Sequence, residues 1–585
     1  MRFKHAATSI LLFTLVTHKQ AQAQAVFPFQ STPNITPSPN VFSKPSLENN
    51  PVSPPPPQSE IPSIDDSTNT KEIIHSLKKV IVAFTSKNQD LSHPLPGTEL
   101  DMTSAVKPFI GRPLTAQTLD LIIKRVNAAC RTLDKPFVYA YIPPQKIVDG
   151  ELHVLLRQYE IGNITITGNR WFSKDLIRYE SGLRSGATPS LSALQSDVDW
   201  LNRSPFRSSE IIFSPGQETG KTNADIYVSD RLPLYFFSSV NNQNDPTIGR
   251  TGWAVGGSWG NAFNLDQIIT YQYSRTTTDR NFNHAAAWQI PITSRNSIII
   301  FGNYAKSHPI APPGVDYQNY GGGASVSFRW QHMLQHWAIG SHFGLDGNIQ
   351  LGYDWKNANS YQKKGEYALT IGNADTNQFL FIYSGSLQDP FGKTEFSNQM
   401  VYGPGGMTRR NNRAAYQTIS LGASPNYFYD RLTLSRSIDL WWKTKLNLKV
   451  IHQSANKNLL YSEQQMLGGI GSVRGYYIST SFGSHANVFN AEWATSTFSI
   501  GHALNWKYLH DETSVAFFWD YGNNRQIKQV VQGIHSVTLS SIGLTTTSKL
   551  THHLNSTLDV GWRLRRARSI GSKGAVVEYN LVAGF

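Results

Sequence analysis

The feature that most constrains this chain is its long second part, from about Leu232 to Phe585, where helical periodicity is absent. Short segments recur there between Gly, Asn, Asp and Ser residues, and each alternates an apolar or aromatic face with a polar one. In Trp442–Val450, for example, Trp, Thr, Leu, Leu and Val alternate with Lys, Lys, Asn and Lys. Soluble β-sandwiches and membrane β-barrels both use such two-faced strands, so the alternation alone leaves both folds open.

Length and composition favour a barrel. The 585 residues are 39% hydrophobic and 16% charged, whereas a typical soluble protein carries about 25% charged residues. About 350 residues of strand pattern, with aromatic residues near the segment ends, match an outer-membrane barrel of on the order of 16 antiparallel strands. A helical membrane protein is excluded because no run of about 18 apolar residues occurs.

The N-terminus has the pattern of a secretory signal peptide. Residues 1–25 combine a basic start, a short apolar stretch and small residues at candidate cleavage positions. We therefore expect an exported protein, for which nucleotide-driven chemistry is not available. Residues 26–70 are rich in Pro, Ser, Asn and Thr and predict an extended linker or arm without a core of its own.

Two successive β-α-α-β-β units are expected between this arm and the strand region. The first, over residues 71–158, is predicted from strand patterns at 80–84, 137–142 and 151–157 and helix patterns near 101–110 and from 115. The second, over residues 159–231, is predicted from strand patterns at 161–167, 211–214 and 224–228 and helix patterns from 174 and at 192–202. The single cysteine, Cys130, lies among the apolar positions of a helix, which predicts a core residue.

Short motifs in both parts of the chain point to one family. A glycine-rich loop ends in Val473, Arg474, Gly475 and Tyr476, and a strand segment contains Phe518, Asp520 and Gly522. These match the Val-Arg-Gly-Tyr and Phe-x-Asp-x-Gly motifs of TpsB transporters, the haemolysin secretion/activation (ShlB/FhaC/HecB) family of two-partner secretion. Stretches similar to the paired POTRA domains of that family contain Pro143, Pro144, Gln145, Asp149, Gly150, Asn202 and Pro205.

The resemblance implies both a fold and a function. The implied fold is two α+β POTRA domains, residues 71–158 and 159–231, followed by an all-β transmembrane barrel over residues 232–585. The implied protein lies in the outer membrane of a Gram-negative cell with its POTRA domains in the periplasm. There they bind a secreted exoprotein, which crosses the barrel unfolded and without ATP. In the family the motif loop folds into the lumen, so Arg474 is expected to contact Asp520, whose carboxylate suits a planar guanidinium.

The chain ends inside an alternating segment. One face of this segment carries Val577, Tyr579, Leu581, Ala583 and Phe585. A barrel must pair its last strand with its first, because otherwise two sheet edges stay open. The terminal Phe585 also resembles the signal that the barrel-assembly machinery of the outer membrane recognises. That machinery and outer-membrane lipid are therefore expected partners.

Three other motifs suggest chemistry that their context argues against. Residues 256–260 fit the G-x-S-x-G nucleophile elbow but lie within an alternating strand. Residues 216–222 resemble a P-loop that is one residue short and are expected to form a hairpin turn. The histidine pair at 552–553 has no carboxylate or cysteine nearby in the sequence, so we expect no metal site. No enzymatic activity and no cofactor are expected.

Two other functions stay open at this point. A barrel-assembly insertase of the same superfamily shares the fold but usually carries more POTRA units. A passive porin explains the barrel but not the N-terminal units. The formal net charge of +13 does not predict nucleic-acid binding, because Lys and Arg are scattered along the chain.

Overall fold

The computed structural model describes residues 73–85, 94–218, 220–293, 295–311, 318–334, 337–339, 343–364, 367–503, 505–506, 511–528, 536–566 and 574–585. The expected signal peptide and the Pro-rich arm lie outside these residues. The chain divides into an N-terminal unit that runs to Leu232 and a C-terminal unit that begins at Pro233. Within the described ranges, no helix has the length and apolar character needed to cross a membrane.

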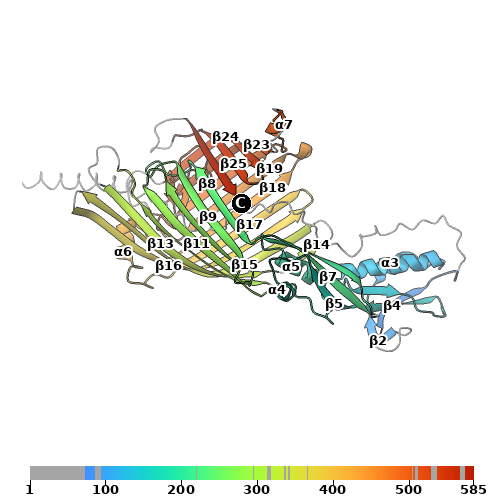
Figure 1. The fold of residues 1–585 in the computed structure, drawn as a ribbon. Coiled ribbons are helices and arrows are strands. Elements are labelled where there is room, and N and C mark those ends of the chain that lie inside the picture. Colours follow the sequence, from blue (N-terminus) through green and yellow to red (C-terminus); the bar gives the residue numbers. More distant parts are fainter. Residues whose placement is uncertain are drawn as a thin grey trace, which may run out of the picture. The chain divides into compact units, whose positions relative to one another are not determined.

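The first half of the N-terminal unit is a four-stranded sheet with a long helix packed against it (Figure 1). Its elements are β1 (Lys79–Thr85), β2 (Pro94–Glu99), α2 (Thr103–Val106), η1 (Lys107–Phe109), α3 (Ala116–Thr132), β3 (Val138–Tyr141) and β4 (Glu151–Gln158). The strand order is β2-β1-β4-β3, with β1 parallel to β4. The edge strand β2 was not predicted from the sequence, since Pro and Gly disfavour strands everywhere except at edges and bulges.

The helix α3 forms where the apolar spacing predicts it. The Thr115 side chain accepts a hydrogen bond from the Thr118 backbone N–H at 3.2 Å and so caps the helix. Val126 and Cys130 lie one turn apart on the buried face, both without solvent exposure. Burial raises the pKa of the Cys130 thiol to about 11, so the thiol stays protonated at neutral pH. Cys130 is therefore a core residue.

The second half of the N-terminal unit repeats the plan. Its elements are β5 (Glu160–Thr167), α4 (Lys174–Glu180), α5 (Leu191–Leu201), β6 (Arg207–Pro215) and β7 (Lys221–Asp230). The strand order is β5-β7-β6, with β5 parallel to β7 and β6 antiparallel to it. The P-loop-like stretch begins directly after β6 and its last residues, Lys221 and Thr222, already belong to β7, so a strand follows and not a helix.

A buried ion cluster joins the helices and strands of this second half. The Glu180 carboxylate accepts from Arg203 and from Arg207, each at 2.7 Å, and the Glu180 side chain is only 3% exposed. Burial alone would raise the pKa of this carboxyl, but the two guanidiniums outweigh burial and hold it below its ordinary value. Glu180 is therefore charged and fully partnered at neutral pH.

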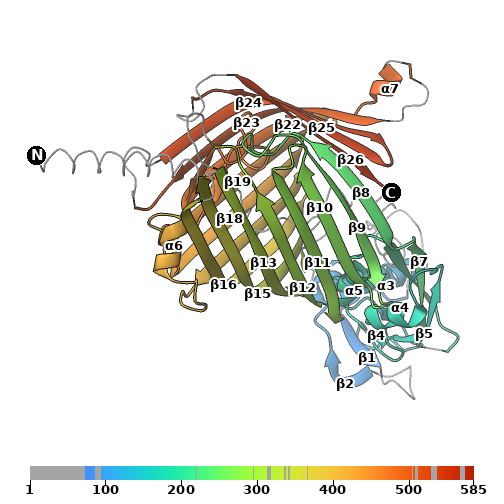
Figure 2. The same ribbon diagram turned by 60° about the vertical axis from the view of Figure 1, so that its left-hand side comes forward.

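The C-terminal unit is a closed antiparallel barrel. Among the described residues it has sixteen long strands and the three-residue strand β14 (Trp337–Ile339). The first eight long strands are β8 (Leu234–Asn241), β9 (Gly252–Ala262), β10 (Gln267–Thr276), β11 (Asn281–Thr293), β12 (Asn296–Ser307), β13 (Gln318–Met333), β15 (Phe343–Lys364) and β16 (Tyr367–Asp389). The other eight are β17 (Gly392–Gly403), β18 (Tyr427–Asp439), β19 (Lys445–Ala455), β22 (His485–Ala494), β23 (Glu512–Arg525), β24 (Ser536–Thr551), β25 (Leu554–Arg563) and β26 (Ala575–Gly584). Their neighbours in the barrel are their neighbours in the chain (Figure 2).

Shorter elements lie in the connections between barrel strands. They are α6 (Arg413–Ile419), η2 (Trp441–Lys443), β20 (Gln465–Leu467), β21 (Ser481–Gly483) and α7 (Ile500–Ala503). The strand expected from Trp442 begins only at Lys445. The preceding residues instead turn through η2, where Trp442 has a left-handed φ of 57° and its alternation is lost.

The last strand closes the barrel on the first. Strand β26 pairs antiparallel with β8 from Asn580 to Gly584. Phe585 extends this pairing, since its backbone N–H donates to the Phe236 carbonyl at 2.9 Å and its carbonyl accepts from Phe236 at 3.1 Å. Val577 and Leu581 are exposed on the outer face, and Glu578 is buried on the inner one. A chain that ends in a strand thus leaves no open sheet edge here.

Candidate functional site

A long connection between β19 and β22 carries the Val-Arg-Gly-Tyr motif. It begins after Ala455 and returns at His485, and β20 and β21 pair within it as a short antiparallel hairpin. We call residues 456–484 the lumen loop, because its tip contacts the inner face of the barrel wall. On β23 that inner face is marked by Phe518 and Asp520, which are buried, while their neighbour Trp519 is 45% exposed on the outer face.

Arg474 at the loop tip binds Asp520 of the wall through three hydrogen bonds. Nε donates to Oδ2 and Nη2 to Oδ1, both at 2.9 Å, and the Arg474 backbone N–H donates to Oδ2 at 3.0 Å. The Asp520 carboxylate is fully buried and also accepts from Asn490 at 2.8 Å. This paired geometry gives an ion pair its greatest strength and directionality.

The remaining donors of Arg474 reach other strands. Its Nη1 donates to Glu492 on β22 at 2.7 Å and to Thr545 on β24 at 3.0 Å. Nη1 also lies 3.9 Å from a carboxylate oxygen of Asp559 on β25. The guanidinium carbon lies 3.6 Å from the centre of the Phe518 ring, in a cation–π contact. One side chain thus ties the loop to four neighbouring strands of the wall.

The glycines of the two motifs allow the loop to approach the wall closely. A Cβ on Gly522 would lie 2.7 Å from Cγ2 of Val473, so only glycine leaves room for the Val473 side chain. Gly475 has a left-handed φ of +85°, and a Cβ there would lie 2.9 Å from the carbonyl of Gly561 on β25. The backbone of the loop therefore rests directly on the backbone of the wall.

Tyr476 also holds the loop tip against the wall. It is fully buried, and its hydroxyl lies 2.6 Å from the carbonyl oxygen of Arg565 and 3.0 Å from that of Ser540. Nε of Arg563 donates to the Gly475 carbonyl at 2.7 Å. The structure thus brings together all seven motif residues that the sequence singled out, in one contact between the loop and β22–β25.

Several residues of this contact have no motif of their own. They are Asn490, Glu492, Thr545, Asp559, Gly561 and Arg563. Each lies on the polar face of an alternating strand, where Ser, Thr, Asn and charged residues are common. Only their cross-strand neighbours distinguish these residues from other polar residues of the wall, as Asn490 is distinguished by lying opposite Asp520. Such pairs can be identified only once the register of the barrel strands is known.

The predicted site residues of the N-terminal unit lie at its turns. Gln145 exchanges two hydrogen bonds with the backbone of His153, at 2.7 and 2.9 Å. Asn202 does the same with Ser209 at 2.9 and 2.5 Å. Further turn positions are Pro143, Pro144, Asp149 and Gly150 between β3 and β4, and Pro205, whose carbonyl accepts from Arg231. None of them belongs to the contact at the loop tip.

The motifs that suggested other chemistry have ordinary structural surroundings. Ser258 is buried on β9, and its hydroxyl lies 2.9 Å from that of Thr270 on β10. Nδ1 of His553 lies 2.8 Å from the Gly584 carbonyl, and its ring stacks on Phe585. Over the described ranges, no cluster of three or more His, Cys, Asp or Glu side chains is arranged to hold a metal ion.

Comparisons with known proteins agree with this architecture. The family model for the haemolysin secretion/activation protein ShlB/FhaC/HecB matches residues 220–546. The heme/hemopexin transporter protein HuxB of Haemophilus influenzae is 20% identical over 464 residues, which cover 76% of this chain and 77% of HuxB.

Solved structures share the fold. CdiB from Escherichia coli has a TM-score of 0.73 at 14% identity and covers 91% of this chain and 94% of its own. CdiB from Acinetobacter baumannii has a TM-score of 0.62, also at 14% identity, and covers 90% and 93%. The predicted fold of α+β POTRA domains followed by an all-β barrel is confirmed. The chain belongs to the haemolysin secretion/activation protein family ShlB/FhaC/HecB, the TpsB-type secretion transporters of the outer membrane.

Proposed function

We propose that this transporter binds one secreted exoprotein in the periplasm through its POTRA domains and passes it, unfolded, through the barrel to the cell surface without ATP. The observation that carries the proposal is the lumen loop. It occupies the inner face of β22–β25 and is held there by hydrogen bonds and an ion pair, with no covalent link. Such contacts can exchange for contacts with an arriving chain.

The POTRA sheets support capture of an extended polypeptide. The first has edge strands β2 and β3, and the second has edge strands β5 and β6. An extended chain can add to such an edge through backbone hydrogen bonds, which are available in any sequence, while neighbouring side chains supply selectivity. An unfolded, β-forming exoprotein is the kind of client that this mode of binding favours.

The source of energy follows from the expected compartment. Beyond the inner membrane there is no nucleotide to hydrolyse, and the expected signal peptide directs the chain there. We propose that folding of the exoprotein outside the cell makes its transit irreversible. HuxB is described as a heme/hemopexin transporter, but at 20% identity that cargo is not assigned to this chain.

Deletion of residues 71–230 separates this function from the alternatives. A passive porin that lacks these residues would still conduct ions in a planar bilayer, and the deletion would change no exoprotein level in the medium. A secretion transporter keeps an assembled barrel but exports none of its partner, measured as exoprotein in the culture medium. If the protein were an insertase, the deletion would instead lower the level of unrelated outer-membrane barrels. Unchanged export by the deletion variant would refute the proposal.

A further inference from the structure

We propose that Glu463 is a second anchor of the lumen loop, a positioning residue that holds the loop against a part of the wall other than the one bound by Arg474. The sequence motifs do not include this residue. It lies in the limb of the loop that precedes β20, eleven positions before Arg474, and its side chain is fully buried. Its effect on export rests on the proposed function, whereas the anchoring itself does not.

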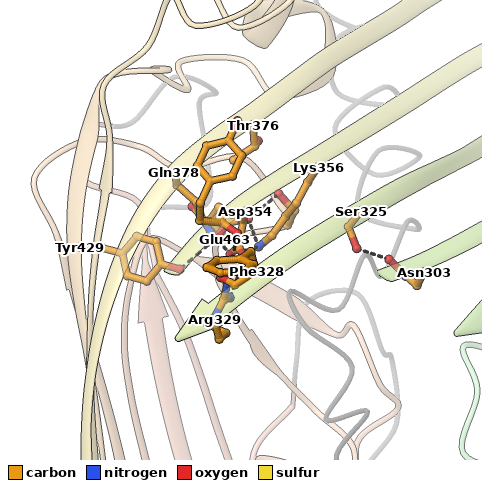
Figure 3. A network of polar contacts seen from close by, with 12 residues as sticks. Asn303, Ser325, Phe328, Arg329, Asp354, Lys356, Thr376, Gln378, Tyr429 and Glu463 are labelled. Carbon is orange, nitrogen blue, oxygen red and sulfur yellow. Dashed lines mark hydrogen bonds and ion pairs between the residues drawn. The ribbon is translucent and has the colours of Figure 1, made fainter. Parts of the chain in front are cut away.

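Both carboxylate oxygens of Glu463 are bound (Figure 3). Oε1 accepts from Nζ of Lys356 on β15 at 2.7 Å, and Oε2 accepts from the hydroxyl of Tyr429 on β18 at 3.0 Å. Oε1 also accepts from the neighbouring Ser462 hydroxyl at 3.1 Å. A buried carboxylate with every oxygen satisfied is costly to displace, because the partners that it leaves behind lose their hydrogen bonds as well.

The backbone of Glu463 is held by the same region. Its carbonyl accepts from Nη2 of Arg431 on β18 at 3.3 Å and from Nε2 of Gln453 on β19 at 3.1 Å. Nε of Arg431 in turn donates to the Gln453 side chain at 2.8 Å. The wall therefore binds this position through its main chain and its side chain together.

Charge explains why a carboxylate is needed at this point. On the wall, Nη2 of Arg329 lies 2.6 Å from Asp354, and Lys356 lies 3.8 Å from the same carboxylate. Two cations thus share one anion, as Figure 3 shows for these side chains. Glu463 supplies a second negative charge next to Lys356, so the signs alternate along the buried row Arg329, Asp354, Lys356, Glu463.

The two anchors bind different sectors of the barrel. Glu463 contacts β15, β18 and β19, and Arg474 contacts β22, β23, β24 and β25. Fixing residue 463 shortens the chain that must be ordered to seat Arg474 on Asp520. The effective concentration of Arg474 near Asp520 is consequently higher than it would be if the loop were held only by β19 and β22.

Disulfide formation between loop tip and wall measures this seating without any exoprotein. In a Cys130→Ala background, Val473→Cys and Gly522→Cys place two thiols at the contact where a Cβ on 522 would lie 2.7 Å from the Val473 side chain. The rate of oxidative cross-linking in outer membranes then reports how often the tip is seated. Glu463→Gln, which keeps the size of the side chain, is expected to lower this rate about tenfold, because the amide carries no negative charge and has one acceptor oxygen where Lys356 and Tyr429 use two.

The matched control is Glu395→Gln, since Glu395 of β17 pairs at 2.7 Å with Lys393 and both side chains are about half exposed. This control should leave the cross-linking rate unchanged. Tyr429→Phe removes one hydrogen bond and no charge, so it should lower the cross-linking rate about threefold. This variant tests the proposal also in the case that Glu463→Gln does not form a heat-modifiable barrel. Equal rates in Tyr429→Phe and Glu395→Gln overturn the second anchor. Normal export by a barrel with slow cross-linking would instead refute the proposed role of the loop.

Discussion

The side chain of Val473 fills the space that the missing Cβ of Gly522 leaves on the inner wall, where an added Cβ would come within 2.7 Å of Cγ2. Loop and wall motifs are therefore complementary in shape as well as in charge. The glycine of the Phe-x-Asp-x-Gly motif accommodates the first residue of the Val-Arg-Gly-Tyr motif, and its aspartate binds the second. This relationship gives a direct way to test whether the loop must move.

A disulfide between these two positions should lock the loop in the lumen. In a Cys130→Ala background, the pair Val473→Cys and Gly522→Cys is expected to abolish export when oxidised and to restore it when reduced. Export of the exoprotein is measured in cells treated with and without a membrane-permeant reductant. Each single cysteine variant is the control and should export equally under both conditions. Undiminished export by the fully cross-linked protein would mean that the loop stays in place during transport.

Loss of either charge at the tip should impair export without preventing barrel assembly. Removing one partner of a buried, hydrogen-bonded pair costs about 3–5 kcal/mol, because the other charge stays buried. Arg474→Ala and Asp520→Ala are therefore expected to reduce exported exoprotein at least about tenfold. Heat-modifiable mobility in gels checks the barrel. The control, Arg275→Ala, breaks the exposed pair that Arg275 forms with Asp279, and its export should be normal.

Glycine at position 475 should be required, and glycine at 471 should not. Alanine at 475 would adopt a left-handed φ, at a cost of about 1–2 kcal/mol, and its Cβ would press on Gly561. A Cβ at Gly471 meets nothing within 4 Å. Gly475→Ala is thus expected to reduce export and to make the loop tip accessible to protease, whereas Gly471→Ala should resemble the native protein. Equal behaviour of the two variants would argue against the close contact of the two backbones.

The second POTRA domain should lose stability at acidic pH through Glu180. In the unfolded chain the pKa of a glutamate is about 4.3, and in the folded domain the pKa of Glu180 lies below that value. The stabilisation that Glu180 gives the folded domain is therefore complete above about pH 4.3, and it is lost as the pH falls through the folded-state pKa. Hydrogen exchange in α4 and α5, corrected for intrinsic rates, should rise in this window. Glu180→Gln should be less stable at pH 7 by about 3 kcal/mol and should show a flatter pH dependence.

The exposed Glu218, which pairs with Lys221, provides the control for that experiment. Glu218→Gln should retain the native pH dependence of exchange in both helices. A native pH profile in Glu180→Gln would show that other groups control the acid stability of this domain.

Local patterns were sufficient to predict most of the fold. The two-residue period of the barrel strands and the helical period of α3 depend on near neighbours in sequence, and both are confirmed by the structure. Features that oppose a local propensity were missed or displaced. Strand β2 contains Pro94 and Gly97 and forms only as an edge, and Trp442 has a strand-like pattern but lies in a turn.

The site was predictable only where a motif marks it. Arg474 and Asp520 were found through the resemblance to a family, and the structure places them in contact. Glu492 and Glu463 look like any other charged residue on a polar face or in a loop. Their partners are far away in the chain, 107 positions for Lys356 and Glu463, and such pairings are fixed by barrel register and loop path rather than by local sequence.

The lumen loop carries opposite charges to the two sectors that it touches. Glu463 neutralises the sector that contains Arg329 and Lys356, and Arg474 lies among Glu492, Asp520 and Asp559. With the loop displaced, three carboxylates would outnumber the cations Arg563 and Lys449 on one side of the channel. On the other side, Arg329, Lys356 and Arg431 would outnumber Asp354. The two sides would then carry net charges of opposite sign, with a field between them across the pore. A polypeptide with mixed charges could turn its basic and acidic side chains toward opposite sides, whereas a long run of one sign would adhere to one side and move slowly.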